Sequence, residues 1–503
     1  MIYVISLIAL FITVIVLALI LFKPSSKYHG IPISEVCNHK MIIIVAIAIS
    51  MICCTLPMNL SPKENGEIPE HRDQYEKITE AFLDGHLDFG YEVDNRLLEL
   101  DNPYDPEKRD KENVSFNWDH SFYNGKYYMY FGVVPVIVTF LPYRIITGHS
   151  LTTFHATQLY VALFILGVFY CFYLLGKKWF KALPISVYIM LSTAFSVMST
   201  CLAVSRPAMY CTAIAAGIAF MIWSISFSLK AVCESKKISL LYATIGSLLG
   251  ALVFGCRPPV GLGNLIIFAL MIYYIKNSRS HRFRFIKVLS CVFPYVFVGA
   301  LLMLYNYLRF NSVFEFGQSY QLTMVDVKNT PSLFNTPSFI GKMELIGTYT
   351  INFAKYLVGV GEASDFLSVR FIDDTGILLT FPILLYCILG LENESVRSSI
   401  KIKRIRLLIL ALILSPLAII LMDIIGSEVI SCRYKMDVYW AFGLLTYMII
   451  GLYYQYKKNK RKFSYFVCVM GIVTILSSVL LFLYPYYDNF TAYYFDEIIG
   501  IIS

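Results

Sequence analysis

Long apolar segments recur along nearly the whole chain, and they limit what it can fold into more than any other feature. A helix needs about 20 apolar residues to cross the roughly 30 Å hydrocarbon core of a bilayer. Twelve segments of the 503-residue sequence approach or reach that length: residues 2–22, 41–58, 155–176, 183–204, 208–229, 239–256, 260–275, 288–307, 375–391, 405–426, 436–455 and 464–485. Because a helix satisfies its own backbone hydrogen bonds in lipid, the sequence predicts an all-α integral membrane protein with about 12 transmembrane helices.

The composition excludes two other classes of protein. Apolar residues make up 57% of the chain and charged residues 15%, which excludes a soluble globule. The net charge of +8 hides an asymmetry, because residues 61–126 contain 17 acidic and 8 basic residues and the remainder carries +17. The excess Lys and Arg lie mainly in short loops between apolar runs, so a nucleic-acid partner is excluded as well. Most of the 12 cysteines lie inside apolar runs and are expected to be packing residues.

The basic loops indicate the orientation, since Lys and Arg are enriched on the cytoplasmic side of membrane proteins. One arrangement places all of them inside and both termini outside: residues 23–40, 177–181, 230–237, 276–287, 397–406 and 457–462. The sequence then predicts a single membrane domain, residues 1–503, with two large extracytoplasmic segments at 59–154 and 308–374. We expect the functional residues on that side.

The apolar stretch Tyr127–Ile146 breaks this alternation if it is counted as a further span. Gly132, Pro135 and Pro142 interrupt its helix continuity, and the aromatic cluster at its start suits the headgroup boundary. We therefore expect it to lie along the outer membrane surface. An ordinary kinked span is the alternative.

The first candidate catalytic residue is Asp73. The segment Glu70–Asp84 predicts a short amphipathic helix, with Tyr75, Ile78 and Phe82 on one face and charged side chains on the other. Such a helix would lie on the bilayer, with Asp73 in its first turn near both the membrane boundary and water. The alternative is that Asp73 only caps or solvates the helix.

The second candidate is Asp119, which lies in the aromatic and turn-rich stretch Asn117–Lys126. The alternative interpretation is a tight polar turn, for which the Asn-Gly pair in this stretch is a strong signal. His71 and His120 could bind a metal ion together with neighbouring acids, but they lack metal-ligand spacing. The sequence therefore predicts no metal site and leaves the use of a divalent cation open.

Four arginines are expected at the outer ends of helices: Arg206, Arg257, Arg309 and Arg433. Arginine presents a fork of donors to phosphate oxygens and keeps its charge where hydration is poor. We expect Arg206, Arg257 and Arg433 to converge on one lipid phosphate, with Arg309 as a fourth member. The alternative is that each arginine reaches ordinary lipid headgroups independently.

These segments resemble the GT-C glycosyltransferases, a superfamily of multispanning enzymes that includes protein O-mannosyltransferases and lipid A aminoarabinose transferases. The resemblance is to bacterial members. Gln74–Asp88 is similar to the helix of their first loop, and Phe122–Gly148 to their surface-lying segment. Two later pieces, Tyr305–Gly317 and the Arg433-Tyr434 pair, also resemble the family. The likeness covers most of the chain in layout, through short local motifs.

The resemblance implies an enzyme of the bacterial cell membrane that takes a sugar from a polyprenyl-phosphate carrier and transfers it to an acceptor on the outer face. The acceptor would be a cell-envelope glycan, lipid or protein. Asp73 would be the general base and Asp119 a second acid near the donor or acceptor, while arginines offset the phosphate charge. Many relatives have two adjacent acids where this chain has Arg72-Asp73, so Glu70 competes with Asp73 for the role of base.

Three other functions remain as alternatives: a flippase or other transporter of lipid-linked sugars, a polysaccharide polymerase or ligase, and a non-catalytic assembly partner. Transporters of this kind bury charges or broken helices inside the bilayer, whereas the charges here are expected at helix ends. The short cytoplasmic loops contain no glycine-rich phosphate motif, which argues against an ATP-driven pump.

Overall fold

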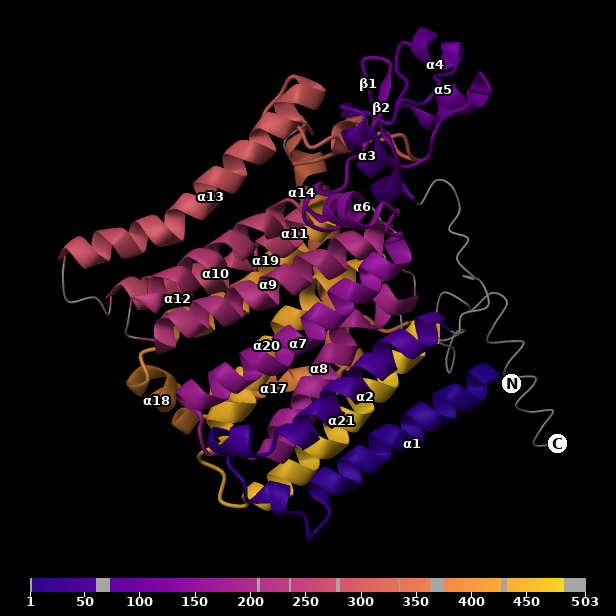
Figure 1. Ribbon diagram of the computed structural model, residues 1–503. Coiled ribbons are helices and arrows are strands. Elements are labelled where there is room, and N and C mark those ends of the chain that lie inside the picture. The colour runs from indigo at the N-terminus through magenta and orange to yellow at the C-terminus, as the bar shows by residue number, and fades with distance from the viewer. Residues whose placement is uncertain are drawn as a thin grey trace, which may run out of the picture.

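The computed structural model describes residues 2–59, 73–205, 209–234, 237–276, 281–333, 335–361, 375–426 and 432–483. Within these ranges the chain forms 20 α-helices and one two-stranded sheet (Figure 1). The chain is a multi-pass helical protein, in agreement with its apolar pattern.

Seven helices in the described ranges are long and apolar enough to cross a membrane. They are α7 (Thr153–Trp179), α9 (Met209–Cys233), the pair α11 (Pro258–Gly261) and α12 (Asn264–Lys276), α13 (His281–Phe310), α19 (Arg406–Gly426), α20 (Cys432–Tyr454) and α21 (Lys460–Leu483). Further apolar helices, shorter over their described side chains, are α1 (Ile2–Phe22), α2 (Lys40–Asn59), α8 (Ile185–Ser205) and α10 (Ile238–Phe254). All but one of the predicted spans therefore coincide with apolar helices.

The predicted span 375–391 is wrong as a continuous helix. The chain there forms α16 (Ile377–Thr380), a 3-10 turn η7 (Pro382–Leu385) and α17 (Tyr386–Glu392), followed by α18 (Glu394–Ile402). Pro382 is the cause, because proline disfavours the helical conformation of the residue before it. Phe381 accordingly has φ −125° and ψ 77°.

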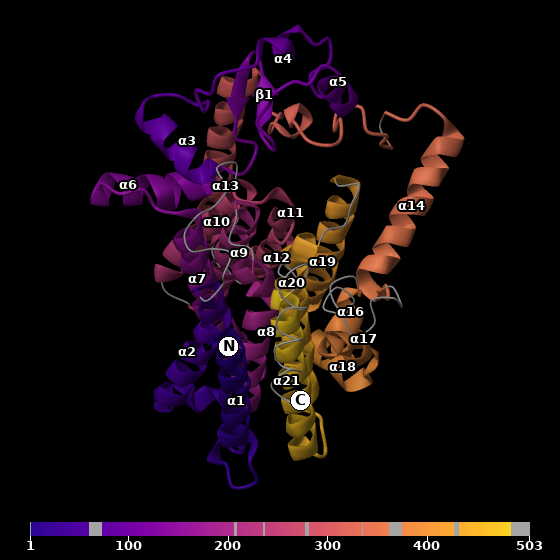
Figure 2. The same cartoon turned by 90° about the vertical axis from the view of Figure 1, so that its right-hand side faces the viewer.

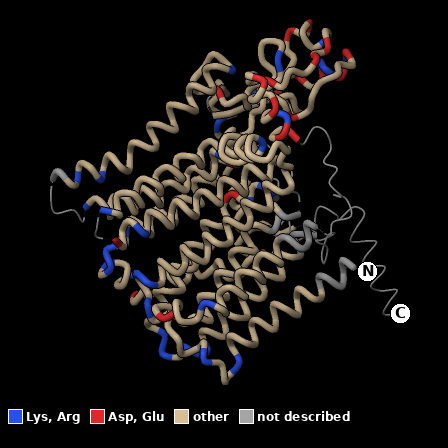
Figure 3. The backbone as a smooth tube through the Cα atoms, in the orientation of Figure 1, with Lys and Arg blue, Asp and Glu red and all other residues tan. Residues whose placement is uncertain are grey.

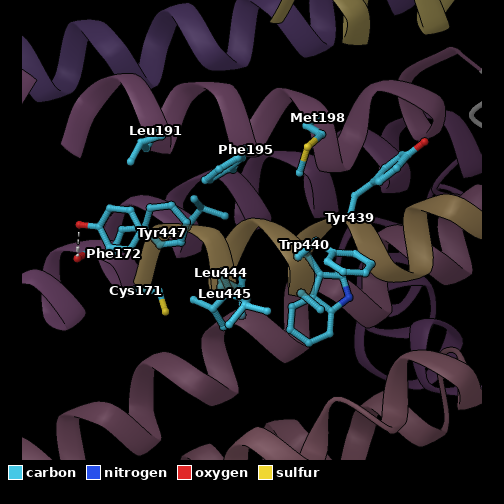
Figure 4. Close-up of a cluster of buried hydrophobic side chains, with 14 of the residues drawn as sticks. Cys171, Phe172, Leu191, Phe195, Met198, Tyr439, Trp440, Leu444, Leu445 and Tyr447 are labelled. Atoms are coloured by element: carbon cyan, nitrogen blue, oxygen red, sulfur yellow. Dashed lines mark hydrogen bonds between the residues drawn. The ribbon is translucent and has the colours of Figure 1, made fainter. Parts of the chain in front are cut away.

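The core of the bundle lies where α7, α8 and α20 meet (Figure 4). The ring of Tyr447 stacks on Phe172 with centroids 3.8 Å apart, and its hydroxyl donates to the Phe172 carbonyl at 2.9 Å. Phe195 of α8 packs edge-on against Phe172. A buried tyrosine needs a partner for its hydroxyl, and this one finds it in the helix backbone of its neighbour.

Charge divides the bundle into two ends (Figure 3). Acidic side chains gather in the first large connecting segment, at one end, and most Lys and Arg lie at the opposite end. We refer to these as the acidic end and the basic end. The connection between α1 and α2, with the 3-10 turns η1 (Lys27–His29) and η2 (Ile33–Asn38), belongs to the basic end. The described parts of the predicted basic loops thus share one side of the molecule.

The first large segment forms a cap on the acidic end (Figure 1). Its elements are α3 (Gln74–Leu83), α4 (Asn95–Glu99), α5 (Pro106–Lys111), β1 (Ser121–Tyr123), β2 (Lys126–Tyr128), the π-turn η4 (Val136–Phe140) and α6 (Leu141–Thr147). The predicted Asn-Gly turn is confirmed, since Asn124 and Gly125 have φ 49° and 72° and close the hairpin. The helix Val136–Thr147 is too short to span a bilayer, and α6 lies across the direction of the long helices (Figure 2).

The second large segment contains η5 (Gln318–Tyr320) and α14 (Phe339–Val358). Helix α14 runs from the acidic end along the outside of the bundle and packs on α19 (Figure 2). The part before α14 joins the first segment: Ser121 Oγ donates to the Gly317 carbonyl at 2.7 Å, and Asn102 Nδ2 donates to Asp326 at 2.7 Å. The two segments therefore form one cap.

Candidate functional site

Helix α3 begins at Gln74 rather than at Glu70. Asp73 occupies its N-cap position, but its side chain makes no capping hydrogen bond. Its Oδ2 lies 3.9 Å from Nζ of Lys77, and the side chain is 24% exposed. The simple capping role is thus not the one observed. Glu70, with residues 60–72, lies outside the described residues, so its competition with Asp73 stays a prediction.

Two carboxylates one turn apart fasten α3 to its neighbours. Glu76 accepts the hydroxyl of Thr153 at 2.6 Å and the Thr153 backbone N–H, at the start of α7. Glu80 pairs with Arg144 of α6 at 2.7 Å. Burial raises the pKa of Glu76, whereas the hydrogen bond from Arg144 lowers the pKa of Glu80. The helix that carries Asp73 is therefore held in place independently of Asp73 itself.

Gln74 connects Asp73 to the second candidate acid. Its side-chain amide donates to the backbone carbonyl of Asp119 at 2.8 Å and lies 3.3 Å from Nδ1 of His120. Gln74 is fully buried and is the residue that follows Asp73. Two candidate acids far apart in the sequence are thus joined through one side chain.

Asp119 has an unusual backbone conformation and is held by hydrogen bonds with the second segment. Its φ is +57°, a region that Asp tolerates better than most residues. Its backbone N–H donates to the Leu322 carbonyl at 3.1 Å, and Gln321 Nε2 donates to its Oδ1 at 2.8 Å. The second segment therefore fixes the position of an acid that belongs to the first.

A tight backbone contact joins the cap to the helix end that carries Arg257. A Cβ atom on Gly132 would lie 2.2 Å from the Gly255 carbonyl oxygen and 2.4 Å from that of Cys256. The Val134 N–H donates to the same Gly255 oxygen at 2.8 Å. Gly132 interrupts the predicted interfacial stretch, and the structure gives the physical reason for a glycine there.

Arg257 and Arg433 are brought together at the acidic end. The guanidinium carbons of Arg257 and Arg433 lie 5.2 and 5.4 Å from the centroid of the same ring, that of Tyr434. Arg257 also forms an ion pair with the fully buried Asp437, with Nη2 and Oδ2 2.7 Å apart. Arg433 stacks on Tyr210 at 4.1 Å.

The electrostatic environment of Tyr130 includes both these arginines and the cap acid. Burial raises the pKa of Tyr130, Asp119 raises it further, and Arg433 and Arg257 lower it. Its ring is 4.1 Å from that of Phe131, which packs edge-on against Tyr210, the ring beneath Arg433. The charges of one cap acid and of two arginines of the bundle thus influence the same tyrosine.

The other two predicted arginines are placed differently. Arg309 is 4% exposed, donates to the Met129 carbonyl and to Asn306, and lies 3.8 Å from the ring of Tyr305. Its guanidinium holds the cap to the end of α13. Arg206 lies outside the described residues, so its share in a phosphate site stays a prediction.

Within the described residues, no three His, Cys, Asp or Glu side chains are grouped to hold a metal ion. His120 is buried, and its Nδ1 lies 2.7 Å from the Trp118 carbonyl. His71 lies outside the described residues. His120 thus forms a hydrogen bond with the backbone of the cap.

Sequence reasoning missed Tyr130, Asp423 and Asp437. Asp423 and Asp437 are single acids inside apolar runs, and such residues are rare enough in spanning helices to indicate function. That signal was available in the sequence. Tyr130 stood out only as a member of the aromatic cluster, because the charges that influence it come from three separate parts of the chain, at Asp119, Arg257 and Arg433.

No protein-family model matches this chain, and no curated protein or solved structure is significantly similar to it. The multi-pass helical architecture therefore rests on the chain itself.

Proposed function

We propose that this protein is a membrane glycosyltransferase of the GT-C type, which moves a sugar from a polyprenyl-phosphate carrier to an acceptor. The observation that supports this most is that Arg257 and Arg433 lie over one ring, that of Tyr434, beside the turn that the cap contacts through Val134 and Gly255. Such an enzyme needs a carboxylate for the acceptor proton and positive charge for the carrier phosphate within one site.

In the proposed reaction Asp73 takes the proton of the acceptor hydroxyl while the acceptor oxygen bonds to the anomeric carbon. The bond from that carbon to the carrier phosphate breaks, and its electron pair leaves with the phosphate. Arg433 would offset the phosphate charge, since the ion pair that the described residues form here engages Arg257 instead. Asp119 is the second acid, which Gln74 and Gln321 hold in the cap.

The charge distribution supports an outward-facing site. The basic end carries most of the Lys and Arg, as cytoplasmic ends of bacterial membrane proteins do. We place the acidic end, with both segments of the cap, on the outer face of the bacterial cell membrane. The acceptor is then a component of the cell envelope.

The proposal is tested with the purified protein in lipid nanodiscs and a panel of polyprenyl-phosphate monosaccharides, with cell-envelope extract as acceptor. The measurement is chromatographic detection of released polyprenyl phosphate. We expect release with the parent protein and a large loss in Arg433→Ala. Arg461→Ala, which removes an arginine at the basic end, is the matched control and should retain release. If no sugar of the panel gives release above empty nanodiscs, the transferase proposal fails.

One observation favours a transporter of lipid-linked sugars as a second candidate. Asp423 and Asp437 lie inside spanning helices and are 5% and 0% exposed, and intramembrane acids are common on transport pathways. The same nanodisc protein, reconstituted in sealed vesicles, distinguishes the two functions. A transporter would move labelled carrier between leaflets without releasing polyprenyl phosphate.

A further inference from the structure

Asp423 is a carboxyl group inside the bundle that has no hydrogen-bond donor among the described residues. It lies in the last turn of α19, is 5% exposed, and neither side-chain oxygen has a partner. Its neighbour Asp437 leaves Oδ1 without a partner, and the hydroxyl of Tyr356, which is 1% exposed, also has none in the described chain. Each of these three buried polar groups therefore has at least one oxygen without a hydrogen-bond partner in the described chain.

These groups come from three helices but form one electrostatic cluster. Asp423 interacts electrostatically with two charged groups, Asp437 of α20 and Arg257 at the start of α11. Tyr356 of α14 interacts electrostatically with both of these aspartates and with Arg257. Both α14 and α20 pack against α19. The cluster is thus a junction between the second cap segment and the bundle.

Arg257, the cation of this cluster, is already paired with Asp437. Arg257 donates from Nε and Nη2 to Oδ2 of Asp437, at 2.9 and 2.7 Å. Of the other cations on α20, Arg433 stacks on Tyr210, and Lys435 donates to a backbone carbonyl at 3.1 Å. Among the described residues, an ionised Asp423 would therefore be a buried charge without a hydrogen-bonded cation, which is far more costly than a neutral acid.

We propose that Asp423 is a proton-binding site, in which its carboxyl holds one proton while Asp437 stays ionised against Arg257. A proton needs a single oxygen. A hard metal cation takes about six or more oxygen ligands, and the described cluster supplies only the two carboxyls and one hydroxyl. The chemistry of the cluster thus fits a proton better than a metal ion.

The proton at Asp423 is coupled to the arginines electrostatically, through the charge that its loss leaves near Arg257. When it leaves, a second carboxylate competes with Asp437 for Arg257. The guanidinium of Arg257 lies against the ring of Tyr434, which Arg433 also contacts. Proton occupancy therefore biases the position of both arginines. This inference does not depend on the proposed transferase activity.

The first test is infrared spectroscopy of the full-length protein in detergent at neutral pH. We expect a carbonyl band of a protonated carboxylic acid in the parent that is absent in Asp423→Asn. Asp94→Asn is the matched control, because Asp94 is a cap carboxylate paired with Arg96 and should contribute no such band. A parent spectrum identical to that of Asp423→Asn would overturn the proposal.

The second test is melting temperature as a function of pH, with sodium, potassium or choline as the only cation. An acid that is protonated in the folded state and ionised in the unfolded state makes folding take up a proton. The parent should therefore lose stability relative to Asp423→Asn as pH rises, by the same amount in all three salts. Equal pH profiles, or a sodium- or potassium-specific stabilisation that Asp423→Asn abolishes, would contradict a proton site.

Discussion

Arg257 and Asp437, 180 residues apart in the sequence, are joined by two hydrogen bonds to one carboxylate oxygen at the acidic end of the bundle. The pair connects the turn between α10 and α11 to the first turns of α20. Tyr130 of the cap lies within electrostatic range of Arg257. The pair thus joins α20 to the turn that the base of the cap contacts through the Val134 N–H and the Gly255 carbonyl.

Removing Asp437 should therefore be costly. Asp437→Ala leaves the Arg257 guanidinium, only 20% exposed, without its carboxylate, and breaking a buried pair from one side costs about 3–5 kcal/mol in the free energy of unfolding. The control is Asp101→Ala, which removes a pair with Lys108 whose carboxylate is 77% exposed and should have no measurable effect. Equal losses of unfolding free energy in the two variants would show that the buried pair stabilises the fold no more than the exposed pair does.

Gly132 gives a second prediction about the base of the cap. An alanine there would place Cβ 2.2 Å from the Gly255 carbonyl oxygen, so the cap must move away from the turn before Arg257. We expect Gly132→Ala to lower the free energy of unfolding by about 1–3 kcal/mol. Gly299→Ala is the control, since no atom lies within 4 Å of its added Cβ and alanine favours a helix. Its thermal unfolding should be unchanged or shifted upward.

Gly132 also shows what the sequence could and could not predict. Apolar length alone located the spanning helices, because the requirement of crossing lipid acts on each segment separately. The same reasoning treated Gly132 only as an interruption of a helix, since the carbonyl oxygens it avoids belong to residues more than 100 positions later. The broken segment 375–391 shows the converse, because Pro382 was visible in the sequence and its effect is local.

The sequence predicted the residue types of the candidate site but not the interactions that join these residues. Asp119 stood out as an acid in an aromatic and turn-rich stretch, and the arginines as charges near helix ends. Their arrangement depends on Gln74, Gln321 and Tyr130, which are ordinary polar and aromatic residues until the fold places them. No local pattern could have identified these three.

The two carboxylates of α3 should respond to pH in opposite directions. Burial raises the pKa of Glu76, so the folded protein holds that proton more tightly than the unfolded chain does. The Glu76 contribution to stability is then lost as pH rises above the unfolded pKa. Arg144 lowers the pKa of Glu80, so its contribution is present above the unfolded pKa and lost as pH falls through the folded one.

Melting curves of Glu76→Gln and Glu80→Gln between acidic and neutral pH check this. As pH rises, Glu76→Gln should gain stability relative to the parent, while Glu80→Gln should lose it. The two variants are matched, because they make the same change one turn apart on one helix. Parallel shifts in both variants would contradict the assignment of burial to one residue and ion pairing to the other.

The orientation of the bundle makes a fourth prediction. Glu107 on α5 and Lys458 before α21 are exposed at opposite ends of the molecule. In a variant without native cysteines, Glu107→Cys should react with a membrane-impermeant maleimide in intact cells, and Lys458→Cys only after the membrane is opened. The reverse pattern would place the acidic cap in the cytoplasm and remove the proposed outer site.

The last prediction concerns the base. Asp73 is partly exposed at the start of a helix that Glu76 and Glu80 hold in place, so Asp73→Asn should remove the basic carboxylate without moving the helix. Transfer should fall by roughly 10²–10⁴-fold while binding of the carrier polyprenyl phosphate persists. Glu70→Gln should have a much smaller effect on transfer. A parent-like rate in Asp73→Asn together with a loss in Glu70→Gln would assign the base to Glu70, and parent-like rates in both variants would leave the transferase mechanism without a base on this helix.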